Sequence, residues 1–198
     1  MNLDLALTKK PLTWARIVLL GGISGAAMDQ IHVRFHVLSY ASPVLGGQSW
    51  WVAPNFGLAT CVIYVLTSLW APQAERARPA APTDTEIAAL ALWFVDAYAA
   101  SAALQDFPAM LAALYGVLFG VRLLGRKDAA AQLGLGASLA LGGCAAEGLL
   151  AATGVFHYER PQLWTVPLWL PGIYVHGAPL AMGIVRRMRG LAARPRQS

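Results

Sequence analysis

The apolar residues of this chain come in long continuous blocks, and this feature constrains the fold more than any other. About 20 helical residues cross the roughly 30 Å hydrocarbon core of a bilayer, so blocks of this length predict transmembrane helices. We predict six helices, at residues 14–33, 49–70, 85–105, 107–124, 129–153 and 164–185. Only 13% of the residues are charged, about half the share in a soluble domain. The sequence therefore predicts an all-α integral membrane protein, a single six-helix bundle spanning residues 1–198.

The basic residues are distributed unevenly over the predicted loops. With the N-terminus in the cytoplasm, 13 of the 15 Lys and Arg residues fall on the cytoplasmic side, and only Arg34 and Arg160 fall outside. This bias follows the positive-inside rule, so we predict that both termini are cytoplasmic. The charges are scattered over four short segments instead of one folded face, so we expect no nucleic-acid partner. Arg outnumbers Lys, and Ala and Gly are abundant, which suggests a GC-rich bacterial genome. We therefore expect the bacterial inner membrane, or the endoplasmic reticulum if the source is a eukaryote.

Several polar side chains fall inside the predicted helices, where a charge at the bilayer centre costs at least about 2.5–3.5 kcal/mol. The hardest to explain by access to water are Asp96, Glu147 and His176. Asp29, His32 and His36 share the spacing of one helix face, but the helix is expected to end before His36 and no further ligand cluster occurs. Two cysteines in separate apolar helices give no metal or disulfide signature either. We therefore expect no metal and no cofactor.

The last predicted helix contains three prolines, Pro167, Pro171 and Pro179. A proline inside a helix removes a hydrogen bond and bends the helix, so we expect a bundle splayed around a central lipid cavity. The candidate lipid-binding residues are Gln30, Trp50, Trp51, Asp96, Tyr98, Glu147, Trp169 and His176. For Trp50 and Trp51, the aromatic belt at the membrane interface is the competing interpretation.

Known catalytic motifs are absent from the sequence, which contains no His-Glu-x-x-His, Gly-x-Ser-x-Gly or P-loop pattern. We therefore expect a non-catalytic protein. Two alternatives stay open. One is an intramembrane lipid-modifying enzyme with Asp96, Glu147 or His176 as acid or base. The other is a small proton-coupled transporter with Asp96 and Glu147 as proton carriers.

Several short segments, in order and spacing, resemble the Insig (insulin-induced gene) family from about Gln30 to Arg187. Ser-Trp-Trp-Val-Ala-Pro at 49–54, followed by Gly57, resembles the Ser-Ala-Trp-Trp-Val-Pro-Pro that opens the family's second helix. Residues 154–158 and 169–174 resemble its Gly-Val-Tyr-Gln-Tyr and Trp-Leu-Pro-Cys-Ile-Phe. Ala-Ser-Ala at 100–102, leading to Asp106 and Phe107, and Leu-Gly-Leu-Gly at 133–136 match the third and fifth helices.

This resemblance implies a six-helix, non-catalytic lipid receptor with cytoplasmic termini. Insig proteins bind oxysterols in animals, retain the escort protein Scap in the endoplasmic reticulum and bind the sterol-synthesising reductase. The family carries Asp-Arg just past its fourth helix, where the aspartate supports Scap binding, whereas here Asp128 follows Gly125-Arg126-Lys127 and is out of register. We predict a diacylglycerol-like or sterol-like membrane lipid as the ligand, and leave open a regulated membrane protein partner and self-association.

Overall fold

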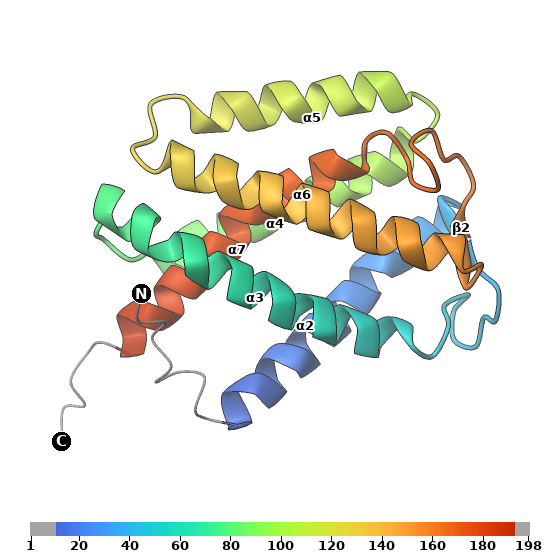
Figure 1. The fold of residues 1–198 in the computed structure, drawn as a ribbon, viewed down its shortest axis with the longest axis horizontal. Coiled ribbons are helices and arrows are strands. Elements are labelled where there is room, and N and C mark those ends of the chain that lie inside the picture. The colour runs from blue at the N-terminus through green and yellow to red at the C-terminus, as the bar shows by residue number, and fades with distance from the viewer. Residues whose placement is uncertain (1–10, 193–198) are drawn as a thin grey trace.

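The computed structural model describes residues 11–192, which form six helices and one two-stranded antiparallel ribbon (Figure 1). The strands are β1 (Leu38–Tyr40), which follows α2, and β2 (Phe156–Tyr158), which follows α6. The helices are α2 (Pro11–Arg34), α3 (Val52–Ala77), α4 (Asp84–Ala103), α5 (Pro108–Leu123), α6 (Ala129–Ala152) and α7 (Leu170–Ala192). Each predicted helical region overlaps one of these helices.

Three helices, α3, α4 and α6, are long and apolar enough to cross a membrane. They contain 26, 20 and 24 residues, and α5 is apolar but shorter, with 16 residues. Almost every large side chain on their outer surfaces is apolar, for example Leu58, Leu92 and Leu141. A mostly helical protein with such surfaces requires lipid as its solvent, so this is an integral membrane protein.

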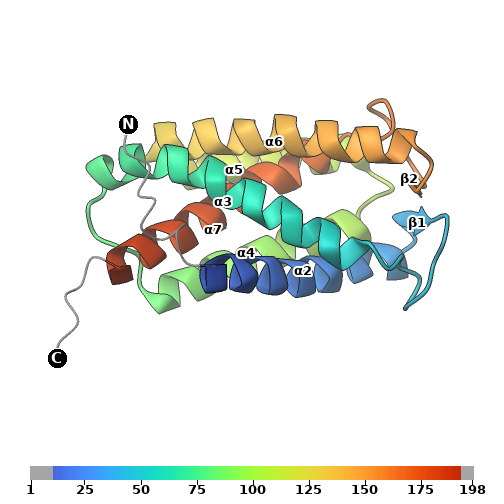
Figure 2. The same ribbon diagram turned by 60° about the horizontal axis from the view of Figure 1, so that its bottom comes forward.

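The two ends of the bundle differ in structure and in charge. Both strands lie at one end, which we call the ribbon end, and the α3–α4 and α5–α6 connections lie at the other (Figures 1 and 2). Because α2 begins and α7 finishes at that second end, most described basic residues gather there, and we call it the basic end. These residues are Arg16, Arg76, Arg78, Arg122, Arg126, Lys127, Arg186, Arg187 and Arg189.

A capping box fixes the start of α4. The Thr83 hydroxyl accepts a hydrogen bond from the backbone N–H of Glu86 at 3.2 Å. The Glu86 carboxylate in turn accepts one from the backbone N–H of Thr83 at 2.8 Å. This capping box satisfies two backbone donors that a helix N-terminus otherwise leaves unpaired.

The start of α7 differs from the prediction, which placed three prolines inside one bent helix. Leu163 and Val166 pair in a tight turn and Trp164 adopts a positive φ of 56°, so the helix begins only at Leu170. Pro167 therefore precedes the helix, and Pro171 lies in its first turn, where no intrahelical hydrogen bond is lost. Only Pro179 lies in the interior, so the three-proline prediction is wrong.

Small residues of α6 let neighbouring helices approach closely. A Cβ added to Gly143 would lie 2.2 Å from ring carbons of Tyr174, and one added to Gly134 would lie 2.3 Å from the Trp70 ring. The aromatic rings of α7 and α3 therefore rest directly on the α6 backbone, which is the packing that small residues permit in membrane bundles.

Candidate functional site

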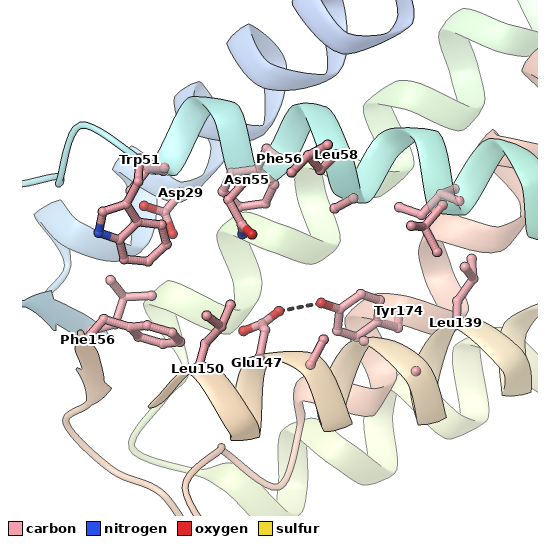
Figure 3. Close-up of a pocket in the computed structure, with 18 of the residues that line it drawn as sticks. Asp29, Trp51, Asn55, Phe56, Leu58, Leu139, Glu147, Leu150, Phe156 and Tyr174 are labelled. Atoms are coloured by element: carbon pink, nitrogen blue, oxygen red, sulfur yellow. Dashed lines mark hydrogen bonds between the residues drawn. The ribbon is translucent and has the colours of Figure 1, made fainter. Parts of the chain in front are cut away.

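A pocket of about 350 Å³ lies between α3 and α6 (Figure 3). Its volume falls at the lower end of the range for small-molecule sites. Most of its wall is apolar, and the side chains that form it come chiefly from the two helices: Phe56, Leu58, Val62 and Leu66 from α3, and Leu139 and Leu150 from α6. The polar lining residues, Ser138 apart, lie towards the ribbon end, where residues of α2, β1 and β2 close the pocket.

Asp29, near the end of α2, supplies one carboxyl group to this polar part of the pocket. Its side chain is buried, with 3% of the residue exposed. The Tyr40 hydroxyl and the Gln48 side-chain N–H each donate a hydrogen bond to Asp29 Oδ2 at 2.8 Å. Tyr40 comes from β1 and Gln48 from the turn before α3, so the Asp29 carboxyl ties the ribbon end to α2 and is already hydrogen-bonded within the chain.

Glu147, on α6, supplies the second carboxyl group. The hydroxyl groups of Tyr158 and Tyr174 donate hydrogen bonds to its two oxygens, one to each. Figure 3 shows the bond from Tyr174, whose ring lies beside the pocket. The Glu147 carboxyl is therefore engaged on both sides by phenols of β2 and α7.

Asn55 differs from the carboxyl and hydroxyl groups of the lining. Its side chain points from α3 into the space between α3 and α6 (Figure 3). Within the described part of the chain, no hydrogen-bond partner exists for its amide. Ser138, by contrast, donates to the carbonyl of Gly134 at 2.8 Å. The pocket therefore offers one unengaged group that can both donate and accept a hydrogen bond.

The charge of the lining limits what the pocket accommodates. Its ionisable groups are two carboxyls and two phenols, and no Lys, Arg or His side chain lines it. An anionic head group would find no cationic partner here, and electrostatic complementarity therefore favours a neutral one. Within residues 11–192, no group of three or more His, Cys, Asp or Glu side chains is arranged to hold a metal ion.

Two of the residues proposed from sequence, Trp51 and Glu147, line this pocket. Gln30 does not line it and donates to the carbonyl of Gly46 at 2.7 Å, which supports the turn before α3. Trp50 is 74% exposed at the ribbon end, as a residue of an aromatic belt would be. Trp169 is 1% exposed and belongs to the core of the bundle.

The other three proposed residues lie around α4. The Tyr98 ring stacks on His32, with 4.1 Å between ring centroids. His176 accepts a hydrogen bond from Trp93 Nε1 at 3.2 Å, and its Nε2 donates to the Tyr115 carbonyl at 3.2 Å. Asp96 lies on the exposed surface of α4, with no hydrogen bond or ion pair among the described residues. None of these three side chains lines the α3–α6 pocket.

Sequence reasoning missed Tyr40, Asn55 and Tyr174 and did not propose Asp29 as a lining residue. Asp29 carried a signal, since it is a carboxyl group inside an apolar block. Tyr174 and Asn55 carried none, because the face that a helical residue presents to a distant helix depends on how the bundle packs.

Two solved structures share this fold. One is the crystal structure of MvINS, a mycobacterial Insig homolog from Mycobacterium vanbaalenii, with a TM-score of 0.66 and 23% sequence identity. The other is a cross-linked MvINS trimer, with a TM-score of 0.69 and 21% identity. Each comparison covers 94% of this chain and 98% of the other. The chain therefore has an Insig-like fold, as the resemblance predicted. No protein-family model matches the sequence, and no curated protein does.

Proposed function

We propose that this chain is a non-catalytic membrane protein that holds a diacylglycerol-like or sterol-like lipid in the α3–α6 pocket. The observation that carries the proposal is the division of this pocket into a long apolar part and a short polar part at the ribbon end. A neutral lipid has the same division, with an apolar body and one small hydrogen-bonding head.

The dimensions of the pocket support this match. Its α3 wall is apolar from Phe56 to Leu66. At 1.5 Å per residue these ten steps span about 15 Å, comparable to the length of an acyl chain or a sterol ring system. The head of the ligand would lie near Asn55 and Glu147, and its apolar part would extend towards Leu66.

We further propose that all six helices span the membrane and that the basic end is cytoplasmic. The gathering of basic residues at one end supports this orientation, because short cytoplasmic segments of membrane proteins are rich in Lys and Arg. The lipid head would then lie at the outer side of the membrane. We place the protein in a bacterial inner membrane, on the Arg-rich composition of the chain.

The hydrogen bonds of two of the three candidate acid and base groups, Glu147 and His176, support binding over chemistry, and the third, Asp96, lies outside the pocket. Both oxygens of Glu147 and both ring nitrogens of His176 are engaged within the protein. A general acid or base must reach the proton that it transfers in the substrate. We therefore favour a binding protein over the intramembrane enzyme and the proton-coupled transporter. By analogy with the MvINS trimer, we extend the proposal to self-association, which native mass spectrometry would measure, and to regulation of a membrane protein partner.

The test is lipid analysis of the protein purified in a mild detergent. We expect one neutral lipid per chain by mass spectrometry, or binding of added dioleoylglycerol or cholesterol at that stoichiometry. Gly142→Leu should reduce the amount of bound lipid, because its side chain would occupy the pocket. Gly142 lines the pocket, and an added Cβ meets nothing within 4 Å. Gly120→Leu on α5 is its matched control, since Gly120 also faces open space but lies outside the pocket. The proposal fails if the folded protein neither carries nor binds a neutral lipid.

A further inference from the structure

The structure contains two copies of one helix–strand–helix unit, and their equivalent residues are 118 positions apart. Tyr40 of β1 corresponds to Tyr158 of β2, since 158 − 40 = 118, and the two strands pair antiparallel about Ser39 and His157. The tight turns agree at the same offset. Leu45 pairs with Gln48 as Leu163 pairs with Val166. Two pairs of residues with positive φ also agree, because His36 and Gly46 correspond to Gly154 and Trp164, whereas Gly47 has no such counterpart at Thr165.

The side-chain contacts repeat at this offset as well. The Asp29–Tyr40 hydrogen bond corresponds to the Glu147–Tyr158 hydrogen bond. An added Cβ on Gly25 would meet the Phe56 ring as one on Gly143 would meet the Tyr174 ring. The unit α2–β1–α3 is therefore equivalent to α6–β2–α7 in backbone and in contacts, and the chain carries an internal duplication with no insertion between residues 25 and 56.

The duplication gives the pocket a counterpart. The pocket lies between α3 and α6, so the equivalent groove lies between α7 and α2. That groove is filled by α4, whose Phe94 and Tyr98 rings pack against Gly177 and His32. Gly177 and His32 correspond to Ala59 and Leu150, which line the pocket. One groove thus holds a helix of the chain, and the equivalent groove is the pocket.

Asn55 marks the difference between the two grooves. Its counterpart is Ile173, which is 5% exposed and belongs to the core of the bundle. Where the chain fills the groove, the position is apolar. In the pocket, the position holds an amide with no partner among residues 11–192. An amide that faces an apolar space without a hydrogen bond costs free energy, so its presence at position 55 favours a ligand that pairs with it.

From these observations we infer that the α3–α6 pocket is the lipid-binding counterpart of the groove that α4 fills, and that Asn55 hydrogen-bonds the polar head of the bound lipid and selects it. This inference rests on the proposed lipid-binding function. The head group has to present a hydroxyl or an ester carbonyl, because these are the neutral lipid groups that pair with an amide.

The experiment compares three probes in detergent: dioleoylglycerol, its deoxy analogue without the hydroxyl group, and its dialkyl ether analogue without the ester carbonyls. We expect the wild type to bind dioleoylglycerol about five- to tenfold more tightly than at least one analogue, as for loss of one buried hydrogen bond. Asn55→Ile, which installs the counterpart residue, abolishes that preference. Leu69→Ile, on the same helix but outside the pocket, keeps it.

Two outcomes overturn the inference and can be told apart. If the wild type binds none of the three probes, the proposed function fails for diglycerides and the inference falls with it. If the wild type and Asn55→Ile bind all three with the same preferences, lipid binding stands and the role of Asn55 is refuted. Ile173→Asn is the control that tests whether a change of packing alone alters the probe preference. We expect it to lower the melting temperature, because it buries an amide in the filled groove, and to leave the probe preference unchanged.

Discussion

Gly142 and Gly143 are neighbours on α6 whose substitution by alanine is expected to change stability in opposite directions. Gly142 faces the pocket, and a Cβ added there meets nothing within 4 Å. A Cβ on Gly143 would lie 2.2 Å from the Tyr174 ring, where ordinary contacts begin at 3.4 Å. Either the ring or the helix must therefore move by about 1.2 Å, the difference between those two distances.

The expected energies follow from these contacts. Gly142→Ala replaces glycine inside a helix at no steric cost and stabilises it by up to about 1 kcal/mol. Overpacking at Gly143→Ala costs about 1–3 kcal/mol. Displacing Tyr174 also takes its hydroxyl away from Glu147, which leaves a buried carboxyl oxygen unpaired at a cost of about 1–3 kcal/mol. The two adjacent variants should therefore differ by about 2–7 kcal/mol.

Thermal unfolding of both variants in the same detergent, followed by tryptophan fluorescence, measures this difference. We expect the melting temperature of Gly143→Ala to lie at least about 4 °C below that of Gly142→Ala, on the scale of 2–4 °C per kcal/mol for a chain of this size. Lipid carried through purification should also decrease in Gly143→Ala, because Tyr174 lines the pocket. Equal melting temperatures would refute the close packing of α7 on α6 from which the energies are derived.

Three further predictions concern the ends of the bundle. Thr83→Ala removes the capping box of α4 and should cost about 1 kcal/mol in the free energy of unfolding, whereas Thr85→Ala, inside the first turn, should cost little. Burial acts to raise the pKa of Asp128, but hydrogen bonds from Arg126 and Gln132 hold this pKa below its usual 3.8. The ionised Asp128 carboxylate therefore contributes stability above pH 3.8, and this contribution is lost as the pH falls through the folded pKa. Acid titration of unfolding should therefore show a smaller loss for Asp128→Asn than for the wild type. Reporter fusions in the 78–83 and 124–128 connections should both report a cytoplasmic location, and a periplasmic signal from either would contradict the proposed orientation.

The helices of this protein could be predicted from sequence because each overlaps a long apolar block, and Thr83 and Glu86 have the local spacing of a capping box at the start of α4. The two strands could not. Each has only three residues, and their pairing depends on turns at His36 and Gly154 that place segments 118 positions apart side by side. The start of α7 was misplaced for a related reason, since an apolar run continues through the tight turn at Leu163–Val166.

The residues of the candidate site likewise include some that could be predicted from sequence and some that could not. Trp51 and Glu147 could be proposed because an aromatic residue at a helix start and a carboxyl in an apolar block are visible in the sequence. Asn55 and Tyr174 could not, because their importance depends on which helices enclose the pocket. The duplication is visible in the sequence at pairs of identical residues 118 positions apart, such as Tyr40 with Tyr158 and Trp51 with Trp169. Most other equivalent positions differ, so the helices of the two units share too few identities for the repeat to be evident.

The duplication explains why this fold contains a pocket at all. Two equivalent units form two equivalent grooves, but the chain between them supplies one hairpin, α4 with α5, and α4 fills only the groove between α2 and α7. The groove between α3 and α6 keeps an apolar wall that no helix among residues 11–192 covers. We propose that a membrane lipid covers it, and the amide of Asn55 would then determine which lipid head is accepted.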